Sequence, residues 1–110
     1  MEYINFFEEF GSPLNPRKRK KLEEFLAKQD LRYDEQIEET VNLVDGKGEI
    51  AATCSLHANV LKCIAVSDKY QGYGLSPRVV TLMINRANEK GIKHLFLFTK
   101  PKNYQMFNDM

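Results

Sequence analysis

The amino-acid sequence predicts an α/β (α+β) domain in which helices flank a mixed, mostly antiparallel sheet. Three apolar segments in close succession, at residues 39–45, 49–56 and 60–66, have the length and residue types of strands. The turn-forming residues "GKG" join the first two strands, which is typical of an antiparallel hairpin. The third strand is almost entirely apolar, so we expect both of its faces to be covered.

The second half of the chain predicts a strand, a helix and a strand in that order. After the strand at 60–66, residues 76–91 carry apolar side chains at helical spacing, and Gly91 is placed to end this helix. Residues 94–100 are again strongly apolar and predict the second strand. Such a crossover implies that its two strands pair in parallel. A short helix is expected at the C-terminal end.

Two helices are expected ahead of the strands. Residues 3–10 bring apolar side chains to one helical face, namely Tyr3, Ile4, Phe7 and Phe10. A longer helix begins after Asn15, because asparagine is a good helix cap and Pro16 suits the first helical position. The basic run at residues 17–21 is followed at once by acidic residues, which is typical of a solvated helix face.

Length and composition favour one globular domain. A chain of 110 residues can bury one hydrophobic core, and its 43% apolar and 28% charged residues are an ordinary globular balance. The formal net charge of +1 provides no global field that would attract nucleic acid. No apolar run approaches the roughly 20 residues that span a bilayer. We therefore expect neither nucleic acid nor a membrane as a partner.

The cysteines and the N-terminal residues point to the cytoplasm. Cys54 and Cys63 lie on predicted neighbouring strands and are expected to be small buried thiols in a reducing compartment. The N-terminal stretch "MEYINFFEEF" is acidic and lacks the basic region and cleavage site of a signal peptide. With the two histidines, the cysteines form no zinc-binding spacing, so no metal is expected.

The stretch "QGYGLSP", residues 71–77, turns the chain from a buried strand into a helix. The first backbone N–H groups of a helix lack intrahelical partners, and the helix dipole favours an anion there. Gly72 and Gly74 allow a positive φ and the close approach of a ligand. The stretch therefore predicts either an anion site, usually for phosphate, or a tight turn with no ligand.

Two common phosphate motifs are excluded. The nucleotide P-loop ends in Gly-Lys-Ser/Thr, which this stretch lacks. The dinucleotide fingerprint needs a third glycine, and Pro77 stands at its position.

The stretch resembles a third motif, Gln/Arg-x-x-Gly-x-Gly/Ala, of the GCN5-related N-acetyltransferase (GNAT) family. Gln71, Gly74 and Ser76 occupy its defined positions, and Gly72 matches a further common glycine. With the neighbouring strands and helices, the resemblance covers residues 38–110. It implies a GNAT fold, acetyl-CoA as cofactor, and acetyl transfer from the CoA thioester to an amine. That amine would be a protein N-terminus, a lysine or a small molecule.

The resemblance also implies which residues bind CoA. The pantetheine would lie along the strand at 60–66, and the pyrophosphate would lie on backbone N–H groups of the glycine stretch. Arg78 would pair with a CoA phosphate, the alternative being a solvated arginine. Pro77 lacks an N–H group, whereas Ser76 adds a hydroxyl donor. The implied cofactor-binding set is Cys63, Ile64, Ala65, Val66, Gln71, Gly72, Tyr73, Gly74, Leu75, Ser76, Arg78 and Asn103.

No catalytic residue is assigned. In the family a tyrosine on the helix after the fifth strand often protonates the leaving thiolate, and Phe107 stands at that position here. Tyr73 and Tyr104 are the candidate replacements. The neutral amine that attacks needs a base or a water path, for which the candidates are Glu49, His57 and His94.

A narrower resemblance supports an alternative function. The phrases "ANVLKCIAVSDKYQGYGL" and "HLFLFTKPKN" resemble the N-terminal acetyltransferase-like domain of the citrate lyase ligases. This resemblance implies an accessory domain that keeps CoA or partner binding but transfers little or no acetyl.

GNAT domains usually continue into two further strands beyond the point where this chain ends, Met110. We therefore expect a single GNAT-like domain over residues 1–110 that is truncated at its C-terminal end. Alternatively, the last strands come from another chain, as in a homodimer.

Overall fold

The structure is a computed structural model, and it describes residues 5–11 and 15–97. The elements in chain order are β1 (Phe7–Gly11), α1 (Pro16–Lys28), β2 (Glu39–Val44), β3 (Ile50–His57), β4 (Val60–Val66), the 3-10 turn η1 (Asp68–Tyr70), α2 (Leu75–Glu89) and β5 (Phe96–Leu97). The strands form one sheet in the order β1-β2-β3-β4-β5. Pairing is antiparallel from β1 to β4 and parallel between β4 and β5. The predicted mixed sheet and its parallel crossover are confirmed.

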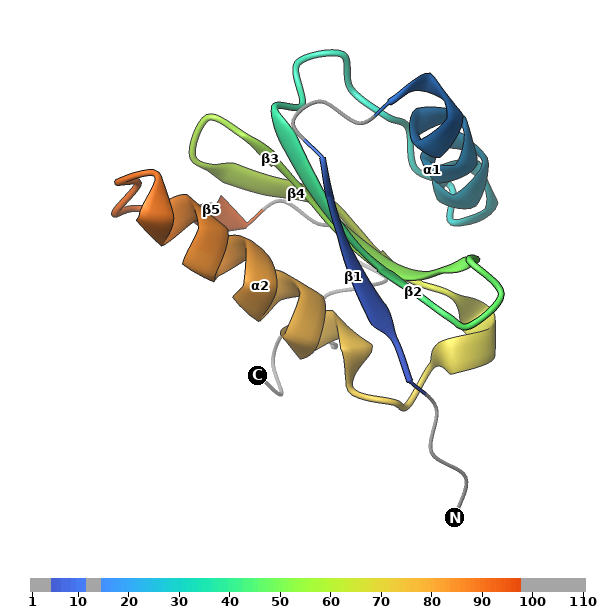
Figure 1. The fold of residues 1–110 in the computed structure, drawn as a ribbon. Helices are drawn as coiled ribbons and strands as arrows, with labels where there is room; N and C mark the ends of the chain where they lie inside the picture. The colour runs from blue at the N-terminus through green and yellow to red at the C-terminus, as the bar shows by residue number, and fades with distance from the viewer. Residues whose placement is uncertain (1–4, 12–14, 98–110) are drawn as a thin grey trace.

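The two helices lie on opposite faces of this sheet (Figure 1). Each face has its own hydrophobic cluster. Leu22 and Leu26 of α1 belong to one cluster, together with Ile37, Val44, Ile50, Cys63 and Ala65. On the other face, α2 contributes Leu75, Val79, Val80, Met83 and Ala87 to a larger cluster with inward residues of β2, β3 and β4. Covering both faces explains why every residue of β2 is buried.

Local sequence signals define the helix ends. The Asn15 side chain accepts a hydrogen bond from the Lys18 N–H at 2.9 Å, so the predicted cap of α1 is confirmed. Past the end of α2, Gly91 adopts a φ of +82° and the Ile92 N–H donates to the Ala87 carbonyl at 3.0 Å. This left-handed glycine ends the helix as expected.

The predicted N-terminal helix is wrong. Phe7–Gly11 forms β1, which lies at one edge of the sheet that the structure describes and pairs Phe7 with Val44 and Gly11 with Thr40. A helix of so few residues ahead of Gly11 has too few hydrogen bonds to offset its nucleation cost, whereas β2 offers a ready ladder of backbone partners. The outward Phe7 is 57% exposed.

Several expectations fall outside the described residues. These are the end of the last strand, the C-terminal helix, and the candidate residues Asn103, Tyr104 and Phe107. Among the helices that the structure describes, none is both long enough and apolar enough to cross a membrane.

Candidate functional site

The chain between β4 and α2 forms a short loop with two left-handed glycines. The Ser67 N–H donates to the Ala51 carbonyl at 2.7 Å, which ties the start of this connection to β3. After η1, Gly72 has a φ of +87° and Gly74 a φ of +71°, a region that side-chain-bearing residues rarely adopt. A β-carbon built on either glycine would meet no atom of the described residues within 4 Å, so these residues leave open space beside the backbone.

Two side chains just ahead of the glycines anchor the loop. The Gln71 Nε2 amide donates to the Val66 carbonyl at 3.0 Å and so links the loop to the end of β4. The Tyr70 hydroxyl donates, at 2.8 Å, to Oδ2 of Asp45, which lies in the turn between β2 and β3. The amide of Gln71 is therefore engaged within the chain.

The start of α2 has hydrogen-bond donors without acceptors. Gly74 is the cap residue, and no side chain in the described part of the chain caps the helix. The N–H groups of Leu75 and Ser76 therefore have no intrahelical partner. The Ser76 hydroxyl is buried and has no hydrogen-bond partner within the described residues. Open space, uncapped N–H groups and an orphaned hydroxyl together suit a phosphate-type anion, so the residues present fit the pyrophosphate of CoA.

β4 carries a bulge in the segment expected to face the pantetheine. Its pairing with β3 shifts by one residue between Thr53↔Ala65 and Ser55↔Lys62, and Cys63 adopts a φ of +54°. Two consecutive residues of β4 therefore oppose one residue of β3. Within the part of the chain that the structure describes, β5 pairs with β4 at Val60 and Leu61 alone. The backbone of Cys63–Val66 thus has no described strand partner on that side.

The side chains of this segment point into the core rather than toward a ligand. Cys63 and Ala65 belong to the cluster under α1, and Ile64 and Val66 to the cluster under α2. Burial raises the pKa of the Cys63 thiol, and burial likewise raises that of Cys54. Both thiols are free and buried, as expected, and both are neutral at pH 7.

The candidate bases do not meet in one place. Glu49 stands just before β3 and His57 ends that strand, so they are about 25 Å apart along it. His94 is exposed ahead of β5. Arg78 is exposed as well and makes no ion pair within the described residues. Tyr73 is 52% exposed, and its ring lies 5.7 Å from that of Tyr70 in an edge-to-face contact.

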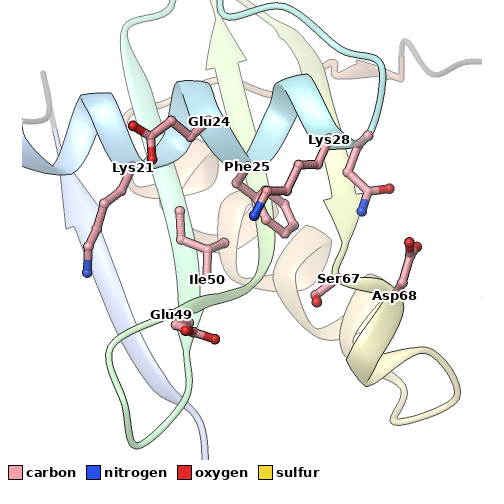
Figure 2. A pocket seen from close by; sticks show the side chains of 9 residues that line it. Lys21, Glu24, Phe25, Lys28, Glu49, Ile50, Ser67 and Asp68 are labelled. Atoms are coloured by element: carbon pink, nitrogen blue, oxygen red, sulfur yellow. The ribbon is translucent and has the colours of Figure 1, made fainter.

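Glu49 lines a groove on the α1 face of the sheet (Figure 2). The sequence did not predict this groove. The groove has a volume of about 410 Å³ and is lined by Lys21, Glu24, Phe25, Lys28, Gln29, Glu49, Ile50, Ser67 and Asp68. Ser67 and Asp68 follow β4 directly, so the groove opens at the same end of β4 as the glycine loop. These residues come from three separate parts of the chain, and no local pattern connects them.

The comparisons with known proteins decide the family. The model of the acetyltransferase (GNAT) family matches residues 4–108. The chain belongs to the GNAT acetyltransferase family. The predicted fold and family are thereby confirmed, whereas the predicted CoA contacts remain predictions.

Among curated proteins, this GNAT chain is similar to [citrate [pro-3S]-lyase] ligases. It is 33% identical to the ligase of Klebsiella pneumoniae over 91 residues, which is 83% of this chain and 26% of that protein. It is 30% identical to the ligase of Haemophilus influenzae over 86 residues, 78% of this chain and 26% of that protein. The chain thus spans about a quarter of the length of these relatives. The narrower resemblance expected from the sequence is confirmed.

Solved structures share the fold. The glucosamine-6-phosphate N-acetyltransferase of Arabidopsis thaliana superposes with a TM-score of 0.69 at 16% identity, covering 94% of this chain and 89% of that chain. The ribosomal-protein-alanine N-acetyltransferase of Brucella melitensis biovar Abortus gives a TM-score of 0.75 at 12% identity, covering 96% of this chain and 90% of that one. At such low identity, the likeness concerns the fold alone.

Proposed function

We propose that this chain binds acetyl-CoA and transfers its acetyl group to an amine, either on a protein or on a small molecule. The observation that carries the proposal is the start of α2, where Gly72 and Gly74 are left-handed and the Ser76 hydroxyl is buried without a partner. Membership of the GNAT family supports acetyl-CoA as the anionic ligand. A turn that merely reversed the chain would need no buried, unsatisfied hydroxyl.

The residues of the loop and of β4 would hold different parts of CoA. The N–H groups from Gly72 to Ser76 and the Ser76 hydroxyl would bind the pyrophosphate. Unpaired backbone groups of Cys63–Val66 would bond the pantetheine like an added strand. Arg78 carries a free positive charge one turn into α2 and would pair with a phosphate. Asn103 stays a prediction outside the described residues.

Acetyl-CoA supplies an acetyl group already activated as a thioester. The part of the protein is to orient that group and to take a proton from the amine, since a protonated amine cannot attack. Of the candidate bases, Glu49 lines a groove that opens at the end of β4. Glu49 lies at the glycine-loop end of β4, where the pyrophosphate would bind, so it is not assigned to proton removal from an amine near the thioester.

A second function is favoured by the curated relatives. They are citrate lyase ligases about four times as long as the matched segment. In a protein of that kind, this chain would be an accessory domain that binds CoA or a partner and transfers no acetyl group to free amines.

One two-stage experiment tests the proposal and separates the two functions. The 110-residue chain is titrated with acetyl-CoA by calorimetry, and then mixed with amine acceptors while released CoA thiol is measured. Binding together with thiol release above the amine-free blank supports the acetyltransferase. Binding without release, across peptides with free N-termini, lysine and small amines, supports the accessory domain. No heat of binding at millimolar acetyl-CoA contradicts both.

A further inference from the structure

We propose that the hydrogen bond between Tyr70 and Asp45 positions the glycine loop for CoA, so that the β2–β3 turn helps to define the pyrophosphate site. This inference rests on the proposed function, because it assigns a role in binding the same ligand. Tyr70 acts through the loop and is a positioning residue. Neither Tyr70 nor Asp45 belongs to the predicted CoA-binding set.

Asp45 is a fixed point of the β2–β3 turn. It is 5% exposed, and its Oδ1 accepts hydrogen bonds from the Lys47 N–H at 2.9 Å and the Glu49 N–H at 3.0 Å. Its backbone N–H also donates to the Glu49 carbonyl at 2.9 Å. The carboxylate therefore has one defined orientation, in which Oδ2 points to the Tyr70 hydroxyl at 2.8 Å.

Tyr70 connects the fixed carboxylate of Asp45 to the loop. It is 7% exposed and ends η1, one residue before Gln71. Its ring meets those of Phe6 and Tyr73 edge-to-face, with centroids 5.1 Å and 5.7 Å away. Tyr73 lies between the two left-handed glycines, so this aromatic contact reaches into the loop itself.

Few other contacts constrain the loop. Within the described residues, the N–H groups of Gly72 and Gly74 make no hydrogen bond. The Gln71 amide holds the loop to β4, and the Tyr70 hydroxyl holds it to the β2–β3 turn. These two anchors, one at the end of β4 and one in the β2–β3 turn, fix both the position and the tilt of the loop. An anion site made of backbone N–H groups needs a loop of fixed position and tilt, because its donors cannot reorient independently.

The test is a double-mutant cycle on CoA affinity. Tyr70→Phe keeps the ring and removes the hydroxyl. Asp45→Ala removes the carboxylate and with it any hydrogen bond from residue 45 to the Tyr70 hydroxyl, whereas an asparagine amide could still donate to that oxygen. We expect each variant to bind CoA about tenfold more weakly than the wild type, and the double variant to bind no more weakly than either single variant. The matched control is Thr40→Val, which removes the buried Thr40–Ser55 hydroxyl bond of 2.9 Å between β2 and β3.

The outcomes separate the two proposals. If the wild type binds CoA but Tyr70→Phe binds within about twofold of it, or if the losses in Asp45→Ala and Tyr70→Phe multiply, the positioning role is wrong and the proposed function stands. If Thr40→Val loses as much affinity as Tyr70→Phe, the effect is general destabilisation and the positioning role is again wrong. If the folded wild type binds no CoA, both proposals fail.

Discussion

The Nε2 amide of Gln71 donates a hydrogen bond to the carbonyl oxygen of Val66, 3.0 Å away, and this bond joins the end of β4 to the glycine loop. Gln71 was expected in the CoA site through its backbone. Its side chain in addition holds the loop to the end of β4 through this hydrogen bond, which explains why a residue with an amide suits this position.

Replacing Gln71 by alanine should weaken acetyl-CoA binding by about tenfold, because the loop then loses one of its two anchors. Calorimetric titration measures the change. Gln36→Ala is the control, since Gln36 is exposed and its hydrogen bond to Asp34 is donated by the backbone N–H. Equal affinity of the Gln71 variant and the control would contradict this role.

Gly74→Ala should destabilise the fold by about 1–2 kcal/mol, the usual cost of a side chain in the left-handed region. The strain comes from the backbone, because no atom of residues 5–11 or 15–97 lies within 4 Å of the new β-carbon. Gly46→Ala has equally free space without a left-handed φ, and it should change the free energy of unfolding by no more than about 0.5 kcal/mol. Urea denaturation compares them, and equal effects would argue against the conformation assigned to Gly74.

Asp45 should make stability depend on pH in the acid range. Burial raises the pKa of Asp45, but hydrogen bonds from Tyr70 and from the N–H groups of Glu49 and Lys47 outweigh it, so its pKa is lowered overall. A folded pKa below the unfolded value of about 3.9 stabilises the fold above that pH and loses this contribution as the pH falls. The difference in melting temperature between wild type and Asp45→Asn should therefore shrink below about pH 4. A difference that stays constant on acidification would show that this carboxylate does not titrate as described.

A buried carboxylate links β2 to α2. Glu39 is 4% exposed and lies 3.0 Å from Arg86 Nε and 3.4 Å from Lys90 Nζ. Arg86→Ala should cost about 2 kcal/mol, below the usual value for breaking a buried pair because Lys90 remains. Glu23→Ala breaks the more exposed pair with Arg19 and should cost about 0.5 kcal/mol or less. Similar losses in the two variants would mean that the Glu39 pair behaves as an exposed one.

Much of the fold could be predicted because its signals are local. Asn15 and Gly91 mark helix ends within one turn, and the apolar strands from residue 39 to 66 are separated by turn residues. β1 could not be predicted, because a strand of five residues is defined by its partner β2 rather than by its own pattern. The period of aromatic residues there suited a helix equally well.

Some features of the candidate site could likewise be predicted from the sequence, and others could not. The glycine loop could be found because Gln71, Gly72, Gly74 and Ser76 stand close together in sequence. The contact of Tyr70 with Asp45 joins residues 25 positions apart, and no local pattern marks either partner. The bulge at Cys63 was hidden because an almost uniformly apolar strand does not reveal which face each side chain occupies.

The proposed CoA site is the backbone from Gly72 to Ser76, which would receive the pyrophosphate. Backbone amide shifts of the 110-residue chain, followed by ¹⁵N NMR during titration with CoA, test it most directly. We expect the amides of Gly72, Gly74 and Ser76 to shift most and Gly74→Val to abolish these changes. Saturable binding that shifts the amides lining the α1-face groove, Lys21, Glu24 and Lys28, while Gly72 and Gly74 stay unchanged, would contradict it.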